Sequence, residues 1–229
     1  MTAPVAVVLI TLNEAHHMAQ VMENLAGFAS EVHVLDSFST DGTVEIAKRY
    51  GAHVVQREFT DFADQWNHAL TALPICAPWT MKMDPDERLS PELKHSLHAA
   101  FAAGAAAAMT VDIQLAFLGK MLPVRLRLLR VWRTGTCRFD GKINEHAVTD
   151  AAPMHVKGVL EHWDSPDLEH WFTKQNRYST AEAKRALALL PTRTPSEKQR
   201  PLRAFLKRNW SRIPLRYLLL HVFHLWKVQ

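Results

Sequence analysis

The sequence contains only two cysteines, and no run of apolar residues approaches the length of a membrane-spanning helix. Such a helix needs about 20 predominantly apolar residues, so we expect no transmembrane segment. Residues 1–10 carry neither a basic leader nor a small-residue cleavage site, and we expect no secretory signal. Cys76 and Cys137 belong to no metal-binding or redox spacing. Two reduced thiols in or near the core fit a protein of the reducing cytosol.

Three common phosphate-binding or phosphate-processing motifs are also absent. No Gly-x-Gly-x-x-Gly follows the first predicted strand, so a dinucleotide Rossmann site is not expected. No Gly-Lys-Ser/Thr occurs, which excludes a P-loop. A phosphatase of the Asp-x-Asp nucleophile type carries that motif after its first strand, whereas the Asp-x-Asp of this chain follows the fourth. A nucleotide site, if present, must therefore belong to another class.

The charges are divided unevenly along the chain. With 229 residues and 48% hydrophobic content, one large domain or one domain with a small appendage is expected. Residues 1–120 hold 7 Lys and Arg against 14 Asp and Glu, whereas residues 121–229 hold 20 against 9. The acidic half suits a cation, and the basic half suits phosphate, anionic lipid or nucleic acid.

The first half alternates apolar runs with segments of helical periodicity. Continuous apolar runs that end in turn residues predict buried strands. Strands are predicted at 5–11, 31–35, 53–56 and 79–83, and helices at 15–28, 43–50 and 61–73. This β-α-β-α-β-α-β order predicts an α/β fold with a mostly parallel sheet and right-handed crossovers.

Acidic, amide and hydroxyl side chains follow three of these strands. They are Asn13 and Glu14, Asp36 and Ser37, and Asp84 and Asp86. In open α/β sheets, ligands bind at the carboxyl ends of the strands. The pattern therefore predicts a nucleotide site at this edge of the sheet.

The Asp84-Pro85-Asp86 sequence has two interpretations. Mg²⁺ takes one or two protein carboxylates and fills its remaining positions with water and substrate phosphate oxygens, so the motif predicts a metal-diphosphate site. The alternative is an acidic turn that opens the next helix, with Ser90 as the N-cap and Pro91 at the first helical position. Both interpretations stay open at this point.

Three segments resemble the family 2 glycosyltransferases of the GT-A fold. They are Ile10-Thr11-Leu12-Asn13-Glu14, the Val34–Thr43 stretch containing Asp36-Ser37-Phe38-Ser39-Thr40-Asp41-Gly42, and Trp79 through Asp84-Pro85-Asp86-Glu87-Arg88. The subgroup most similar is the bacterial lipopolysaccharide-core β-1,4-glucosyltransferase type. The match is specific over residues 5–95 and looser to about 185. It implies a GT-A-type, Rossmann-like sheet flanked by helices, to which the residues of this chain add a basic helical extension at the C-terminus.

The resemblance also implies roles for individual residues. It places Asp36 at the base of a UDP-sugar, turns Asp84 toward the ribose and the metal, and makes Asp86 a metal ligand. The other nucleotide-binding candidates are Thr11, Asn13, Glu14, Ser37 and Asn67. Trp66 departs from the family pattern, because a basic residue is expected there.

A basic and apolar alternation over residues 123–132 predicts a strand that resembles the Arg-Leu-Phe-Arg strand of the family. Guanidinium groups suit phosphate because their donors form a planar fork. Arg127 and Arg130 are therefore candidates for contacts with the diphosphate or the acceptor. The alternative is a half-exposed strand with solvated arginines.

The stretch from Phe139 to His146 resembles the Gly-x-Val-His-Glu segment of the family. An inverting transfer needs one base, which takes the proton of the acceptor hydroxyl as it attacks the anomeric carbon. Glu145 is the candidate base, and Asp140 is the reserve. The alternative for Glu145 is a surface ion pair with Lys142.

A later histidine can reach the metal or the diphosphate in folds of this kind, and His162 is the candidate. The alternative is a structural histidine. The metal carries the charge of the leaving UDP as a Lewis acid, so a protein acid is not required.

The expected organisation is a single domain followed by a basic segment. A helix over 91–103 ends at Gly104, a strand follows near 109–113, and a helix over 167–190 shapes the acceptor side. The expected boundaries are 1–190 for the GT-A domain, divided into a nucleotide half 1–95 and an acceptor half 96–190, and 191–229 for the segment.

The segment 198–229 holds eight Lys and Arg and no acid. A helix starting near Pro214 is too short to span a bilayer, but it can lie in the interface of an anionic membrane. The alternative is a helical pair that packs on its own domain or on a second copy.

These expectations combine into one function. We expect a metal-dependent inverting glycosyltransferase that moves a hexose, glucose first, from a UDP-sugar to a glycan or glycolipid acceptor. It would act at the cytoplasmic face of the cell membrane, in cell-envelope polysaccharide or lipopolysaccharide-core synthesis. Mg²⁺ and Mn²⁺ both accept oxygen ligands, so the ion stays open.

Two rival functions follow from the same sequence. A sugar-nucleotidyltransferase needs a glycine-rich phosphate loop after the first strand, where this chain has Asn13-Glu14. A polyanion-binding protein could use the basic half, but that leaves the acidic strand ends unexplained. The tail lacks a nucleic-acid-binding motif, and no nucleic-acid partner is expected.

Overall fold

The computed structural model describes residues 2–104, 106–117, 119–141, 145–163, 167–169, 171–173, 175–176 and 179–180. By its contacts the chain divides into two units, residues 1–164 and 165–229. The predicted helix over 167–190 falls in the second unit, where the described residues from 168 onward are helical. The rest of that helix, the predicted boundary at 190 and the basic tail lie outside the described residues.

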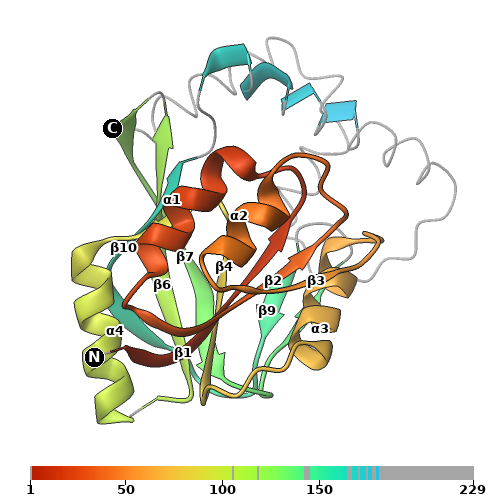
Figure 1. Cartoon of the computed structure of the whole chain (residues 1–229). Helices are drawn as coiled ribbons and strands as arrows, with labels where there is room; N and C mark the ends of the chain where they lie inside the picture. The colour runs from red at the N-terminus through yellow and green to blue at the C-terminus, as the bar shows by residue number, and fades with distance from the viewer. Residues whose placement is uncertain are drawn as a thin grey trace, which may run out of the picture. The chain divides into compact units, whose positions relative to one another are not determined.

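The first unit alternates strands and helices and then turns to strands alone (Figure 1). Its elements are β1 (Ala3–Thr11), α1 (Ala15–Leu25), β2 (Ala29–Asp36), α2 (Thr43–Arg49), β3 (His53–Gln56), α3 (Phe62–Ala72), β4 (Trp79–Met83), β5 (Glu87–Leu89), α4 (Pro91–Ala103), β6 (Ala108–Phe117), β7 (Lys120–Arg133), β8 (Arg138–Asp140), β9 (His146–Val148) and β10 (Met154–Trp163).

Eight of these strands form one sheet in the order β3-β2-β1-β4-β7-β6-β10-β5, and β8 and β9 form a separate pair. The β3-β2-β1-β4 half is parallel throughout, as expected from its helical crossovers. In the other half only β6 and β10 are parallel, and the remaining pairs are antiparallel. The predicted α/β fold is confirmed, with a mixed rather than parallel second half.

The core lies on both faces of the sheet. Because successive strand residues point to opposite faces, β1 sends Val7 and Leu9 to one hydrophobic cluster and Val8 to another. The first cluster is covered by α1, α2 and α4, and the second by α3 with Trp132 and Phe139 (Figure 1). All residues of β1 from Val5 to Leu9 are fully buried.

The helix starts follow the predicted capping chemistry. Asp61 caps α3 by accepting a hydrogen bond from the backbone N–H of Asp64, and Ser90 caps α4 by accepting from that of Leu93. Asp84-Pro85-Asp86 therefore precedes a capped helix, as the alternative interpretation of this motif predicted. A capped helix and a cation site are compatible, because the cap uses Ser90 and leaves both aspartates.

Several element boundaries differ from the prediction. Helix α1 ends at Leu25 rather than Phe28, because the chain turns at Gly27 with φ +71°. Strands β6 and β7 are longer than predicted and form a hairpin at Gly119, which has φ +77°.

Strand β10 was not predicted, although Met154, Val156 and Leu160 alternate with polar residues. Its register with β6 shifts between His155 and Val159. Gly158 lies in this shift with φ +96°, and a Cβ there would be 2.4 Å from the backbone nitrogen of Leu93. The close approach joins β10 to the start of α4.

The structure bears on two further expectations, the lack of a membrane-spanning helix and the positions of the two cysteines. None of the helices in the described part of the chain has the length and apolar character needed to cross a bilayer. Cys137 is half-buried, but Cys76 is exposed. The expectation of a core or near-core position is therefore wrong for Cys76.

Candidate functional site

Strands β1 and β2 end side by side at the predicted edge, where Thr11 pairs in register with Asp36. The Thr11 hydroxyl donates to Asp36 Oδ1 at 2.8 Å, and Asp36 Oδ2 accepts from the Ser39 N–H at 2.8 Å and from Gln56 Nε2 at 2.9 Å. Asp36 is fully buried. Its carboxylate organises the loop that follows β2, and a direct bond to a nucleobase would require one of these donors to be replaced.

The loop after β1 is fastened to the loop after β2 by hydrogen bonds. Asn13 adopts φ +57°, and its side-chain oxygen accepts from the Thr40 N–H at 2.8 Å. The Glu14 N–H donates to the Thr43 hydroxyl at 2.8 Å. Ser37 accepts from Gln65 Nε2 at 3.2 Å, which links the second loop to α3. Hydrogen bonds within and between these two loops therefore connect the predicted nucleotide-binding residues Thr11, Asn13, Glu14, Asp36 and Ser37.

The acidic motif leaves β4 and turns directly into β5. The Asp84 N–H donates to Glu87 Oε2 at 2.8 Å, and the Glu87 N–H donates back to the Asp84 carbonyl at 3.0 Å. On the other side, the Trp163 N–H of β10 donates to the Asp86 carbonyl at 2.7 Å. His162 lies in the same strand, and its Nδ1 is 3.5 Å from Asp86 Oδ1. The structure thus places two of the three predicted metal ligands, Asp86 and His162, side by side, and Asp84 lies two residues before Asp86 in the same turn.

Glu87 is a further acid of this cluster that the sequence analysis did not select. It is fully buried, and its Oε1 accepts from Arg130 Nη2 at 2.7 Å. Arg130 lies 3.4 Å from Asp84 Oδ2 and is itself buried. It sits at a register shift in which Val131 pairs with Met109 and the residue before Arg130 pairs with Thr110. A bulge of this kind redirects a side chain, and here it accompanies the pairing of Arg130 with the acids.

The charges in this cluster shift each other's proton affinities. Burial acts to lower the pKa of His162, but the pairing with Glu87 and the charges of the neighbouring carboxylates outweigh it and raise that pKa to about 9. Burial acts to raise the pKa of Asp84, but the positive charges of Lys82, Arg130 and His162 hold it below its ordinary value. The aspartate is therefore ionised near neutral pH and available to a cation.

Arg127, which was predicted beside Arg130, has a different partner. Its Nε donates to Asp112 Oδ1 on β6 at 2.9 Å, and its side chain is 57% exposed. Only Arg130 joins the acids after β4. The alternative prediction of a solvated arginine therefore fits Arg127, which is mostly exposed, and does not fit Arg130, which is buried.

The candidate base Glu145 forms an ion pair that was not predicted. Its Oε1 accepts from Lys82 Nζ at 2.9 Å, and both side chains are largely buried. The ammonium also lies 4.6 Å from the ring centroid of Trp66 and 5.3 Å from that of Phe139. The other partner considered for Glu145, Lys142, lies outside the described residues.

Trp66 belongs to the hydrophobic core. Its indole is fully buried and stacks on Phe139 with 5.3 Å between centroids and 24° between planes. The positive charge beside Trp66 is that of Lys82 on β4, 4.6 Å from the ring centroid. A charged residue inside an apolar strand could have been noticed in the sequence, but its partner 63 residues away could not.

Two predicted site residues remain, Asn67 and Asp140. Asn67 donates from Nδ2 to the Phe139 carbonyl at 2.8 Å and accepts from the Phe139 N–H at 2.8 Å, so its amide joins α3 to β8. Asp140 is exposed and lies 3.7 Å from Arg138 Nε. These contacts place Asn67 between α3 and β8, and Asp140 beside Arg138.

Two solved structures are similar to parts of this chain. A glucosyl-3-phosphoglycerate synthase from Mycobacterium tuberculosis, crystallised with Mn²⁺, UDP and glucosyl-3-phosphoglycerate, is 24% identical with a TM-score of 0.41, over 50% of this chain and 44% of that one. Staphylococcus aureus TarS 1–349, crystallised with UDP-GlcNAc, is 16% identical with a TM-score of 0.49, over 70% and 56%. The chain thus spans about half the length of these solved chains.

Two curated relatives cover more of the sequence. An uncharacterized glycosyltransferase of Rickettsia bellii (strain RML369-C) is 28% identical in an alignment 207 residues long, which covers 80% of this chain and 68% of the relative. The lipopolysaccharide core biosynthesis glycosyltransferase LpsC of Rhizobium meliloti (strain 1021) is 28% identical over 192 residues, 79% of this chain and 70% of LpsC.

A family model matches one continuous part of the chain. The model described as glycosyl transferase family 2 matches residues 6–166, which is more than half of the chain. This agrees with the family and the enzyme class that the three sequence motifs predicted. The chain belongs to glycosyl transferase family 2.

Proposed function

We propose that the protein is a metal-dependent, inverting hexosyltransferase that uses a UDP-sugar. The observation that carries the proposal is the cluster of Asp84, Asp86, Glu87 and His162 at the carboxyl end of β4. Strand β4 pairs in parallel with β1, and the hydrogen-bonded Thr11 and Asp36 lie at the ends of β1 and β2. Ligands bind at such an edge in open α/β sheets.

The donor set suits a hard divalent cation. Asp84 and Asp86 would supply carboxylate oxygens, which Mg²⁺ and Mn²⁺ accept. His162 would have to lose the proton that its raised pKa favours before its ring nitrogen could join them. When bound, the cation supplies Lewis acidity that stabilises the charge of the departing diphosphate. Glu87 and Arg130 hold the turn that presents these ligands, because their pair is buried beneath it.

Glu145 serves as the base in this proposal. The acceptor hydroxyl oxygen forms the new bond to the anomeric carbon, while the bond from that carbon to the diphosphate oxygen breaks. The hydroxyl proton passes to Glu145, and the electron pair of the broken bond leaves with UDP. Lys82 fixes the carboxylate that receives the proton, since it holds Oε1 at 2.9 Å.

The donor contacts and the acceptor are finer parts of the proposal. Thr11, Asn13, Glu14, Asp36 and Ser37 line the nucleotide, and glucose is the first sugar to test. Similarity to a relative named for lipopolysaccharide core biosynthesis supports a glycan or glycolipid acceptor of the cell envelope. Residues 198–229 would hold the protein at the cytoplasmic face of an anionic membrane.

Calorimetric titration with UDP tests the donor site. Wild-type protein is titrated with and without Mn²⁺, alongside Asp86→Ala and the exposed-acid control Asp150→Ala. We expect binding that requires both the ion and Asp86 and that is retained in the control. Hydrolysis of UDP-glucose and other UDP-sugars then identifies the donor. Absence of UDP binding with or without the ion would refute the proposal.

Vesicle flotation tests the membrane contact separately. Full-length protein is mixed with vesicles containing anionic lipid or only neutral lipid, at low and high salt. Binding that needs anionic lipid and weakens with salt supports the role of the tail. Equal flotation with neutral vesicles would argue against it.

A further inference from the structure

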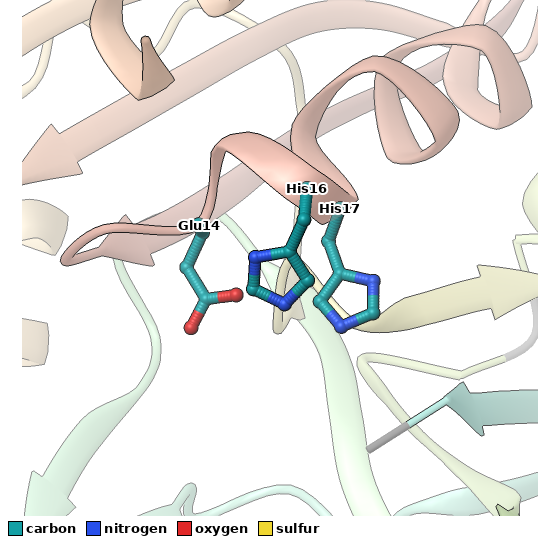
Figure 2. Close-up of side chains that lie close together, drawn as sticks. All are labelled: Glu14, His16 and His17. Carbon is teal, nitrogen blue, oxygen red and sulfur yellow. The ribbon is translucent and has the colours of Figure 1, made fainter. Parts of the chain in front are cut away.

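A second group of metal-ligating side chains lies at the start of α1. Glu14 precedes the helix, and His16 and His17 form part of its first turn. One ligand atom of each residue lies within 4.8 Å of those of the other two. Figure 2 shows the carboxylate and both imidazole rings extending from the same turn to the same side of the ribbon.

The backbone that carries these three residues is held on two sides. The Glu14 carbonyl accepts from the His17 and Met18 N–H groups, both at 2.9 Å, which closes the turn. The N–H of Glu14 donates to Thr43, and that of Ala15 donates to Asp41 Oδ2 at 3.0 Å. The loop after β2 therefore fixes the helix start, and only the side chains need to adjust to a ligand.

The distances are close to those of a bound ion. A tetrahedral ion with bonds of about 2.1 Å holds its ligand atoms about 3.4 Å apart. Separations of up to 4.8 Å thus need a contraction of little more than an ångström. The two imidazole rings are already neighbours, with centroids 4.1 Å apart and planes inclined by 45°. Small rotations of exposed His16 and partly exposed Glu14 provide this contraction.

The donor chemistry differs from that of the cluster after β4. Two imidazole nitrogens and one carboxylate oxygen suit Zn²⁺, whereas sites built mainly from carboxylates suit Mg²⁺ and Mn²⁺. We infer that Glu14, His16 and His17 form a second cation site, selective for Zn²⁺ and related late transition metals. Three protein ligands leave the fourth tetrahedral position open to water or to an anionic group.

The position of the site relates it to the acidic motif without merging the two. Arg88 Nη2 donates to the His17 carbonyl at 3.1 Å, and Arg88 Nη1 donates to the carbonyls of Pro85 at 2.6 Å and Glu87 at 2.7 Å. One buried guanidinium thus joins the helix turn that carries His17 to the turn that carries Asp86. The inference does not depend on the transferase activity, because zinc binding is measured on its own.

Zinc affinity is measured by competition with a chromophoric chelator, in excess Mg²⁺ that occupies the hard-cation site. The variants are His16→Ala and Glu14→Gln, with His95→Ala as the control because it removes an exposed histidine from α4. Asp86→Ala shows whether the motif after β4 contributes. Thermal unfolding without metal checks that each variant is folded.

We expect one zinc equivalent that is retained in His95→Ala and Asp86→Ala. In His16→Ala and Glu14→Gln the affinity should fall by about 100-fold or more, since even removal of an outer partner of a metal ligand costs about 10–100-fold. Wild-type zinc affinity in folded His16→Ala would overturn the inference. So would a loss that appears equally in His95→Ala, or one that appears in Asp86→Ala alone.

Discussion

Lys82 Nζ lies 2.9 Å from Glu145 Oε1, and the rings of Trp66 and Phe139 lie beside the same ammonium group. The pair connects the centre of β4 to the candidate base 63 residues later. A buried lysine on an apolar strand is rare unless it is paired. The pair therefore explains why β4 carries a charge in its interior, and it makes Lys82 a positioning residue for Glu145.

Replacing Lys82 with methionine should separate catalysis from donor binding. Methionine fills similar space but cannot hold Glu145, and misplacement of a reacting group by about 1 Å can cost about 100-fold in rate. We expect kcat to fall by about that factor while UDP affinity stays close to wild type. Lys82→Arg should recover part of the loss, because it keeps the charge. A parallel loss of UDP affinity and kcat would assign Lys82 to the donor site instead.

The choice between the two candidate bases can be tested with amide variants. Glu145→Gln should reduce kcat by about 10²–10⁴-fold, the range of general base catalysis, with UDP binding preserved. Asp140→Asn is the matched variant, because Asp140 is an exposed carboxylate of the neighbouring strand β8. We expect little change from it in steady-state kinetics. The reverse pattern would make Asp140 the base.

The Glu87–Arg130 pair should stabilise the folded protein. Removing one partner of a buried ion pair costs about 3–5 kcal/mol, because the other charge is left buried without compensation. We expect Arg130→Met to lower the free energy of unfolding in urea by about this amount. The double variant Glu87→Gln/Arg130→Met should recover part of the loss.

A second arginine of β7 supplies the control for this measurement. Arg127→Met removes a guanidinium that is mostly exposed and paired with Asp112, and it should change stability little. Equal losses from the two arginines would mean that burial of the Glu87 pair is not the cause.

Gly158 should tolerate alanine less well than Gly135. Both residues have positive φ, +96° and +82°, so a side chain strains each backbone by about 1–2 kcal/mol. Only at Gly158 would the new Cβ meet the backbone of Leu93, at 2.4 Å from its nitrogen, whereas at Gly135 nothing lies within 4 Å. We expect Gly158→Ala to lose about 1–3 kcal/mol more than Gly135→Ala in urea unfolding. Equal losses would show that the close approach of β10 to α4 has no energetic weight.

The two thiols should react at different rates. Burial raises the pKa of Cys137 to about 11, so about one thousandth of it is thiolate at pH 8. Cys76 is exposed. Maleimide should therefore label Cys76 first, and Cys76→Ser should lose the fast phase while Cys137→Ser keeps it. Mass spectrometry of partly labelled protein distinguishes these sites.

Most elements of the first 104 residues were predictable, because their apolar runs end in turn residues; the end of α1 and the short strand β5 were not. The strands at β3 and β4 and the helix α4 match the expected ranges, and His162 Nδ1 lies 3.5 Å from Asp86 Oδ1. These predictions rest on local patterns, and on the rule that parallel strands end at one edge.

The missed residues depend on contacts that are distant in the sequence. The partners of Glu87 and Lys82 come 43 and 63 residues later in the sequence. Arg127 and Arg130 look equivalent in the sequence, but the register shift at Arg130 accompanies a different environment. A bulge has no reliable signature in one sequence, so the division of these two roles required the structure.

The short strand β5 pairs with β10, so Glu87 faces His162 across some seventy residues of chain. During synthesis the ribosome completes the acidic motif long before it reaches Trp163, whose N–H holds the Asp86 carbonyl. At about 5–20 residues per second, the motif waits several seconds for this strand. We expect a nascent chain to lack the arranged cation site during that interval. Assembly of the site would then mark the point at which the whole sheet has been made.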